Sequence, residues 1–103
     1  MPKVIKVCEI QELTPGQVQS FQVEDKEISI CRVNGNYYAF DDVCTHQYGS
    51  LSDGWLEEYT IECPLHGAQF DIRSGEVLCL PAVENINTYK VVIDESNVFI
   101  ELI

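Results

Sequence analysis

The sequence has few basic residues. Only 6 lysines and arginines stand against 17 aspartates and glutamates, which gives a formal net charge of −11 spread along the chain. This charge excludes nucleic acid as a favoured partner, because a phosphate backbone attracts basic surfaces. The acidic surface favours a soluble monomer, and it can also steer the chain toward basic patches on other proteins.

Long apolar runs are also missing. Nowhere does the chain carry the roughly 18 consecutive apolar residues of a membrane-spanning helix. Residues 1–7 contain a few alternating apolar side chains, but no apolar run of signal-peptide length. We therefore expect a cytoplasmic protein with no membrane segment.

The chain is short, and its 103 residues predict a single domain, 1–103. Apolar residues make up 46% of it and charged residues 22%, which is too hydrophobic for a disordered chain. A domain of this size buries only about 60 to 65% of its unfolded surface, so a bound cofactor would help to stabilise it.

Five cysteines are present, an odd number, and their spacing is a poor match to a ladder of disulfides. A reducing compartment with metal-bound and free thiols fits this pattern better. Cys8, Cys31 and Cys79 lie within or beside predicted strands, where a free cysteine usually packs as a small apolar residue. We expect these three in the core.

Most segments alternate apolar and polar residues with a period of two and end in turn residues, which predicts an all-β fold of short antiparallel strands. Turns at 24–26, 34–35, 74–75 and 94–97 predict four hairpins. Asn34-Gly35 is the strongest signal, because a type I′ turn needs positive φ at both central residues. Only residues 9–13 could form a helical turn.

The alternation fades between Asp41 and Glu62, in a stretch rich in Gly, Ser and Asp. Such a stretch is long for a connection in a small domain, which favours a functional role. Trp55 lies within it. Its side chain either packs the long connection onto the core, which is the plainer expectation, or contributes to a docking surface.

The pattern that carries chemistry is Cys44-Thr45-His46, sixteen intervening residues, and Cys63-Pro64-Leu65-His66-Gly67. Thiolates suit ferric iron and zinc, and neutral imidazole is a weaker donor. A [2Fe–2S] cluster and a zinc site that only stabilises the fold are therefore both possible. Zinc fingers usually pair Cys with Cys and His with His, the second pair on a helix, whereas here each pair is mixed and no helix is predicted to follow.

Mixed ligation has a consequence for redox chemistry. With two thiolates and two imidazoles an oxidised [2Fe–2S] cluster is formally neutral, whereas four thiolates make each redox state two charges more negative. Mixed ligation accordingly raises the reduction potential from roughly −400 mV to between about −150 and +300 mV.

This pattern resembles that of the Rieske family, Cys-x-His followed after about sixteen or seventeen residues by Cys-x-x-His. The resemblance covers nearly the whole chain, and the stretches CTHQYGSLSDG and ECPLHGAQFDIRSGEV are similar to those of the stand-alone Rieske ferredoxins of ring-hydroxylating dioxygenases. It implies a small antiparallel β-sandwich, barrel-like, with the cluster held by two hairpin loops.

The resemblance implies one Rieske-type [2Fe–2S] cluster per chain. In the family, the residues matching Cys44 and Cys63 hold the buried iron, and those matching His46 and His66 hold the outer iron near solvent. The implied function is that of a soluble one-electron carrier, not an enzyme, in aromatic hydrocarbon catabolism. A flavin-dependent NAD(P)H ferredoxin reductase would be the donor and a terminal oxygenase the acceptor.

Two other functions remain open from the sequence alone. One is a Rieske small subunit of a larger reductase, such as nitrite reductase. The other is a zinc-stabilised structural module. An enzyme in its own right is not expected, because both histidines are assigned as ligands and no Ser/His/Asp or paired-carboxylate arrangement is visible.

Departures from respiratory-chain Rieske proteins predict how the cluster is tuned. That class joins its two loops by a disulfide, but the corresponding positions here are Tyr48 or Gly49 and Leu65. It also carries Ser and Tyr hydroxyls that donate to the cluster and its Cys sulfur, where this chain has Ala68 and Phe70. Loss of both donors predicts a potential of roughly −150 to 0 mV.

Three further residues each have two interpretations. Gly49 and Gly67 either let the loop backbones approach the cluster or serve as ordinary turn residues. Pro81 either belongs to a third loop over the cluster, as the resemblance implies, or ends a strand.

Overall fold

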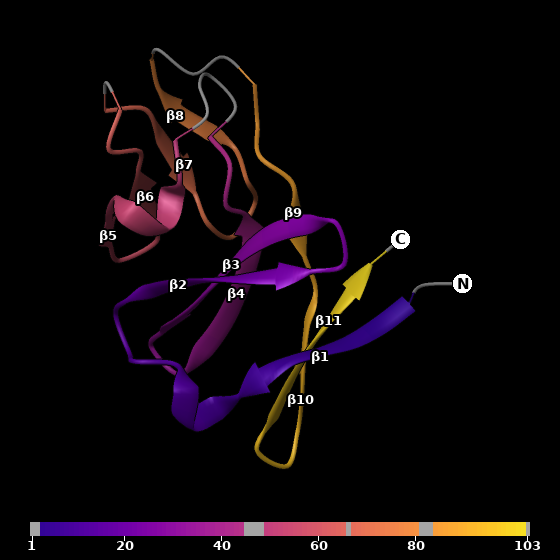
Figure 1. Ribbon diagram of the computed structural model, residues 1–103. Helices are drawn as coiled ribbons and strands as arrows, with labels where there is room; N and C mark the ends of the chain where they lie inside the picture. The colour runs from indigo at the N-terminus through magenta and orange to yellow at the C-terminus, as the bar shows by residue number, and fades with distance from the viewer. Residues whose placement is uncertain (1–2, 45–48, 66, 81–83, 103) are drawn as a thin grey trace.

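The computed structural model describes residues 3–44, 49–65, 67–80 and 84–102, and antiparallel strands dominate it (Figure 1), which confirms the all-β expectation. In chain order the elements are β1 (Lys3–Glu9), the 3-10 turn η1 (Ile10–Glu12), β2 (Val18–Val23), β3 (Lys26–Val33), β4 (Asn36–Asp41), the 3-10 turn η2 (Leu51–Asp53), β5 (Trp55–Glu57), β6 (Thr60–Glu62), β7 (Gln69–Asp71), β8 (Val77–Cys79), β9 (Thr88–Tyr89), β10 (Val91–Asp94) and β11 (Asn97–Leu102). No helix in these described ranges is long and apolar enough to cross a membrane.

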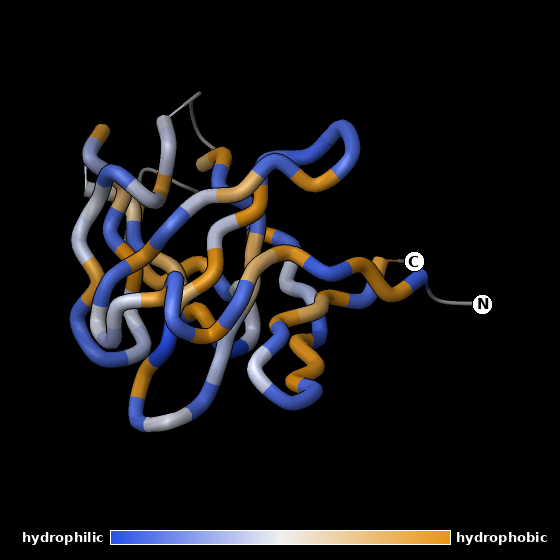
Figure 2. Tube along the Cα trace, turned by 60° about the horizontal axis from the view of Figure 1, so that its bottom comes forward, coloured by the Kyte–Doolittle hydropathy of each residue, from blue (hydrophilic) through white to orange (hydrophobic). Residues whose placement is uncertain are grey.

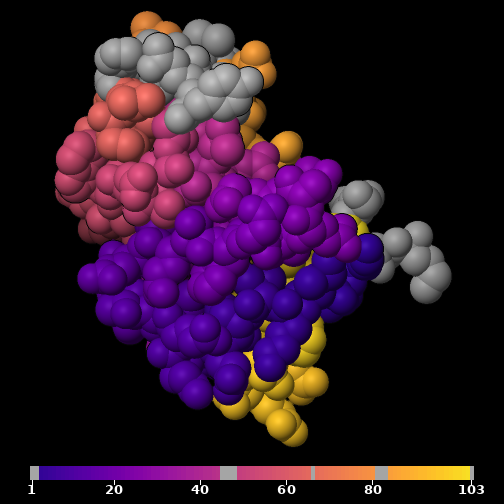
Figure 3. All heavy atoms as spheres, in the orientation of Figure 1, coloured from indigo at the N-terminus to yellow at the C-terminus, as the bar shows by residue number. Residues whose placement is uncertain are grey.

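The strands form three antiparallel sheets, with orders β1-β11-β10, β2-β3-β4-β9 and β5-β6-β7-β8. The third sheet forms a lobe on one side of the other two, which together make the base (Figures 1 and 3). The chain enters this lobe from β4 and returns from it to β9, and β4 pairs with β9. The lobe therefore starts and ends at neighbouring strands of the base.

Strand β3 joins the two parts, because both of its faces are buried. Ile28 and Ile30 pack on the base side, together with Val98 and Ile100 of β11. Cys31, on the opposite face, packs into the core of the β5–β8 lobe. The period-two alternation of this strand thus separates two apolar cores rather than a core from solvent. Figure 2 shows short apolar and polar segments following one another along much of the chain.

The hairpin turns fall where the sequence predicted them. Asn34 and Gly35 have φ values of 52° and 80°, which confirms the type I′ geometry. The turns before β3, before β8 and between β10 and β11 are also present, and η1 confirms the single helical turn expected near residues 9–13. Local turn chemistry therefore determines most of the strand connections.

The stretch between Asp41 and Glu62, which the sequence suggested is a long connection, contains regular secondary structure. It contains η2 and the β5–β6 hairpin, whose turn holds Glu58 at φ 53°. Leu56 packs against the core of the lobe, and Ile61 is fully buried in it. Each strand has only three residues, so it offers a single inward side chain and too short a pattern to recognise as alternation.

Candidate metal centre

The two cysteines expected as ligands lie side by side. Cys44 follows β4 and Cys63 follows β6, and both are buried in the core of the lobe, at 3% and 0% exposure. Burial raises the pKa of the Cys63 thiol to about 11; the Leu65 N–H opposes the rise, and a hydrogen bond with Cys44 adds to it. Two adjacent thiolates that are buried away from water need a neighbouring positive charge, which a metal centre supplies.

Each cysteine closes a loop with its own backbone. The Cys44 N–H donates to the Gly49 carbonyl at 2.9 Å, and the Cys63 N–H donates to the Ala68 carbonyl at 2.7 Å. The Leu65 N–H donates to Cys63 Sγ at 3.4 Å, which is suited to a thiolate acceptor. The described parts of the two loops thus bring two sulfurs together.

The glycines of these loops have different roles. A Cβ on Gly49 would lie 3.0 Å from Leu65 Cδ1 and 3.1 Å from Cys63 Sγ, so a side chain here would crowd the opposite loop. Gly67 has a φ of 75°, and among the atoms that the structure describes the nearest to a Cβ placed there would be Glu62 Oε2, at 3.8 Å. Gly49 therefore permits close approach of the two loops, whereas Gly67 supplies a left-handed turn.

A buried carboxylate fixes the base of the first loop. Asp42 is 2% exposed, and its Oδ1 accepts hydrogen bonds from Ser29 Oγ at 2.7 Å and from the Ser52 N–H at 2.9 Å. The Leu51 N–H donates to the Asp42 carbonyl at 2.7 Å. Asp42 therefore connects β3 to both ends of the loop that carries Cys44. Sequence reasoning missed this pair, because no local signal links Ser29 to Asp42.

The remaining predicted site residues His46, His66, Tyr48 and Pro81 lie outside the described residues, so their roles stay predictions. Within the described ranges no group of three or more His, Cys, Asp or Glu side chains could hold a metal. The donors present are two adjacent buried sulfurs. This half of the predicted set fits the thiolate-bound iron of a mixed Cys/His cluster.

The two positions without hydroxyl groups lie in the same core as the cysteines. Ala68 and Phe70 are both fully buried there with Cys63. A hydroxyl at either position would be shielded from water. Hydroxyl groups introduced at these two positions would thus lie in the apolar core that contains both sulfurs.

Two sequence predictions were wrong, and both concern edge strands. Cys79 is exposed, whereas Cys8 and Cys31 are buried as expected, and no disulfide joins any of the five cysteines. Trp55 is 62% exposed and does not pack onto the core. Cys79 ends β8 and Trp55 begins β5, the two outer strands of the lobe sheet, where Leu56 takes the inward position beside Trp55.

Comparison with known proteins identifies the family. The family model of the Rieske [2Fe–2S] domain matches residues 3–90. The ferredoxin component of the naphthalene 1,2-dioxygenase system of Pseudomonas putida is 42% identical over 100 residues, which cover 97% of this chain and 96% of that protein.

Two solved structures are similar along nearly their whole length. Sphingomonas yanoikuyae B1 ferredoxin is 30% identical, with a TM-score of 0.92 over 97% of this chain and 99% of that one. A chain in the complex of reduced oxygenase and oxidized ferredoxin in carbazole 1,9a-dioxygenase is 32% identical, with a TM-score of 0.87 over 94% of this chain and 91% of that one. The chain thus belongs to the Rieske [2Fe–2S] domain family, and its cofactor is the Rieske-type cluster that the sequence predicted.

Proposed function

We propose that this protein is a one-electron carrier that takes electrons from a flavin-dependent NAD(P)H ferredoxin reductase and passes them to a terminal oxygenase. The observation that carries the proposal is the pair of buried thiols, Cys44 and Cys63, on two loops of a chain similar along its length to a dioxygenase ferredoxin. The solved complex of an oxygenase with a ferredoxin supports the oxygenase as acceptor.

The proposed ligands are Cys44 and Cys63 with His46 and His66. When bound, a [2Fe–2S] cluster takes up and gives back a single electron. The surrounding core excludes water from both sulfurs, and the Leu65 N–H donates a hydrogen bond to the sulfur of Cys63. Backbone hydrogen bonds at the base of each loop hold the cysteines in place, so a change of charge at the site needs little rearrangement.

Exposed apolar side chains lie in the described parts of the two cysteine loops and at the end of β8. Val43, next to Cys44, is 41% exposed, and Leu65, within the second loop, is 38% exposed. Leu78 and Leu80, at the end of β8, are also exposed. An apolar rim of this kind suits brief contacts with a partner protein, because removing water from apolar surface carries little desolvation penalty when the two surfaces meet.

The alternatives are less well supported. Two relatives that are 42% and 40% identical over at least nine-tenths of both chains are ferredoxin components of dioxygenase systems, which are electron-transfer subunits rather than catalytic enzymes, so the reductase small subunit is not favoured. A zinc-stabilised module has no support from these relatives. We further propose that residues 1–103 form one domain that works as a monomer in the cytoplasm.

Stopped-flow spectroscopy with the reductase and oxygenase of the Pseudomonas putida naphthalene dioxygenase system tests the proposal. The chain should be reduced by NADH only when the reductase is present, and the reduced chain should be oxidised by the oxygenase with one electron per chain. The Cys63→Ser variant should do neither. A chain that holds its cluster but exchanges electrons with neither protein would contradict the proposal.

A further inference from the structure

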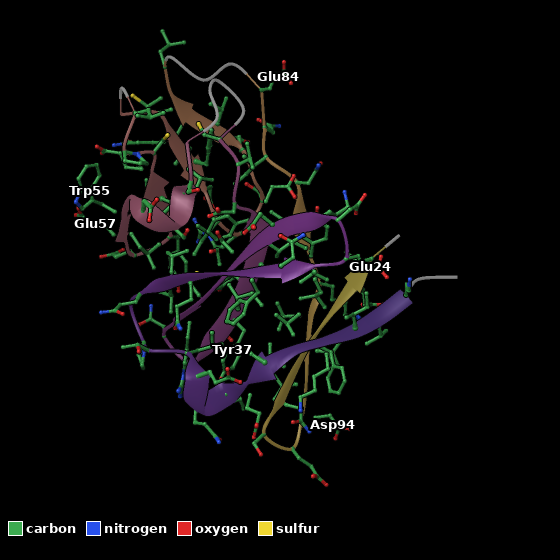
Figure 4. The ribbon with its side chains drawn as sticks, in the orientation of Figure 1. Glu24, Tyr37, Trp55, Glu57, Glu84 and Asp94 are labelled. Atoms are coloured by element: carbon green, nitrogen blue, oxygen red, sulfur yellow. The ribbon has the colours of Figure 1, made fainter. Side chains whose placement is uncertain are left out.

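The outer face of the lobe sheet carries an exposed tryptophan among carboxylates. Trp55 pairs across the strands with Glu62, and Glu57 pairs with Thr60, so these side chains share one face. The opposite face carries Leu56 and Ile61, which pack into the core. Figure 4 shows Trp55 and Glu57 projecting outward together from β5. We refer to Trp55, Glu57, Glu58 and Glu62 as the Trp55 face.

Trp55 stands between two surface grooves and lines both of them. One groove, of about 530 Å³, runs over β5, β6 and β7 and includes the carboxylates of the Trp55 face. The other, of about 320 Å³, reaches across to Gly16 and Ser52. With 62% of its surface exposed, the indole is a ridge that a partner's side chains could contact from either side. An exposed aromatic of this size is the residue type most enriched in binding hot spots.

The first groove carries uncompensated negative charge. Glu57 and Glu58 form no ion pair with any residue that the structure describes. Arg73 lines the same groove, but its guanidinium donates to Asp71 at 3.1 and 2.9 Å and lies 4.3 Å from the centre of the Tyr59 ring. Among the described residues that line this groove, the one basic side chain, Arg73, is therefore already paired.

The Trp55 face also adjoins the second cysteine loop. Glu62 immediately precedes Cys63 and accepts a hydrogen bond from Gln69 Nε2 at 2.9 Å. Its Oε2 lies 3.8 Å from the point where a Cβ on Gly67 would stand. A protein seated on this face would therefore lie against the loop that holds one of the sulfurs.

We propose that the Trp55 face is a docking surface for a protein that presents exposed arginine or lysine side chains and exchanges electrons with this chain. The inference rests on the proposed function. A cation can lie over the indole of Trp55 while it meets the carboxylates beside it, which combines cation–π and charge contacts. An apolar partner would instead bury unpaired carboxylates at a cost, and a polyanion would be repelled.

The test compares variants at two ends of the molecule. Trp55→Ser with Glu57→Gln removes the aromatic surface and one charge from the Trp55 face. Ile93→Ser with Asp94→Asn makes the same kind of change on the exposed β10 hairpin, far from the lobe in Figure 4. Second-order rate constants are measured in both directions with the Pseudomonas putida naphthalene dioxygenase reductase and oxygenase, over a series of salt concentrations.

We expect the Trp55/Glu57 variant to lower the rate constant about fivefold or more with at least one partner at low salt, and to weaken its salt dependence. Trp55→Phe, which keeps a π face, should stay within about twofold of wild type. The reduction potential and the paramagnetic resonance spectrum of all variants should match wild type. A control variant that slows as much as the Trp55/Glu57 variant, or equal rates for all, would overturn the docking surface. If wild type itself transfers no electron to either protein, the proposed function fails and the inference fails with it.

Discussion

Removal of the Asp42 carboxylate should destabilise the protein more than any conservative change around it. In Asp42→Ala the fully buried Ser29 hydroxyl and the Ser52 N–H both lose their acceptor. Each unsatisfied group costs about 1 to 3 kcal/mol, so the variant should lose about 2 to 6 kcal/mol. That is a large share of the 5 to 15 kcal/mol by which a typical domain of roughly this size is stable.

Two matched variants separate the hydrogen bonds from other effects. Asp42→Asn keeps an oxygen acceptor and should lose only about 1 to 2 kcal/mol, because neutral hydrogen bonds are weaker than charge-assisted ones. Ser29→Ala removes one donor and should lose a similar amount. The double variant Asp42→Ala with Ser29→Ala should lose about 1 to 2 kcal/mol less than the sum of its parts, because both changes remove the same bond.

Anaerobic urea titration followed by circular dichroism measures these differences. With a slope of about 2 kcal/mol per molar urea, the middle of the usual range, Asp42→Ala should lower the midpoint by about 1 to 3 M. The cluster absorbance should also decay faster, because Asp42 holds both ends of the Cys44 loop. Strictly additive losses, or an Asp42→Ala variant within about 0.5 kcal/mol of wild type, would refute this account of the loop.

Three further predictions concern the lobe. Ala68→Ser and Phe70→Tyr should each raise the reduction potential by about 40 to 90 mV, since a buried hydroxyl stabilises the more negative reduced state; voltammetry that shows no rise in the double variant would contradict this. Gly49→Ala should shorten the half-life of the cluster absorbance, because its Cβ would press on the opposite loop; an unchanged half-life would argue against that contact. The hydrogen bond from Arg73 lowers the pKa of Asp71, so the carboxylate stabilises the fold above its unfolded pKa of about 4, and this stability disappears as pH falls through the lower folded-state value. The urea midpoint of Asp71→Asn should therefore lie below that of wild type at neutral pH, and the difference should shrink below about pH 4; a constant difference would count against the sign of the shift.

Local chemistry explains what the sequence could predict. Asn34-Gly35 encodes its own turn, because few other residues adopt positive φ at both positions. The expectation that Cys44 and Cys63 lie close together came from their metal-ligand spacing and from the family resemblance, and it needed no knowledge of the strand order. These features need no knowledge of the rest of the structure.

Long-range placement explains what the sequence could not predict. Trp55 and Cys79 look like core residues by type, but they lie on outer strands of a four-stranded sheet, and a three-residue strand does not reveal which face is buried. The Ser29–Asp42 contact joins a base strand to the cysteine loop, and neither residue carries a signal that points to the other. Ser29 even occupies the position that alternation assigns to solvent. Only the packing of two cores against β3 accounts for its burial.

The most direct test of the account is pulsed electron paramagnetic resonance of the dithionite-reduced protein grown with nitrogen-15 histidine. The chain has two histidines, so the label reports on His46 and His66 alone. Mixed ligation predicts couplings to two histidine nitrogens that change with the label, with one unpaired electron per chain. A reduced cluster without such couplings, or a colourless protein that contains zinc, would contradict mixed ligation by Cys44, His46, Cys63 and His66.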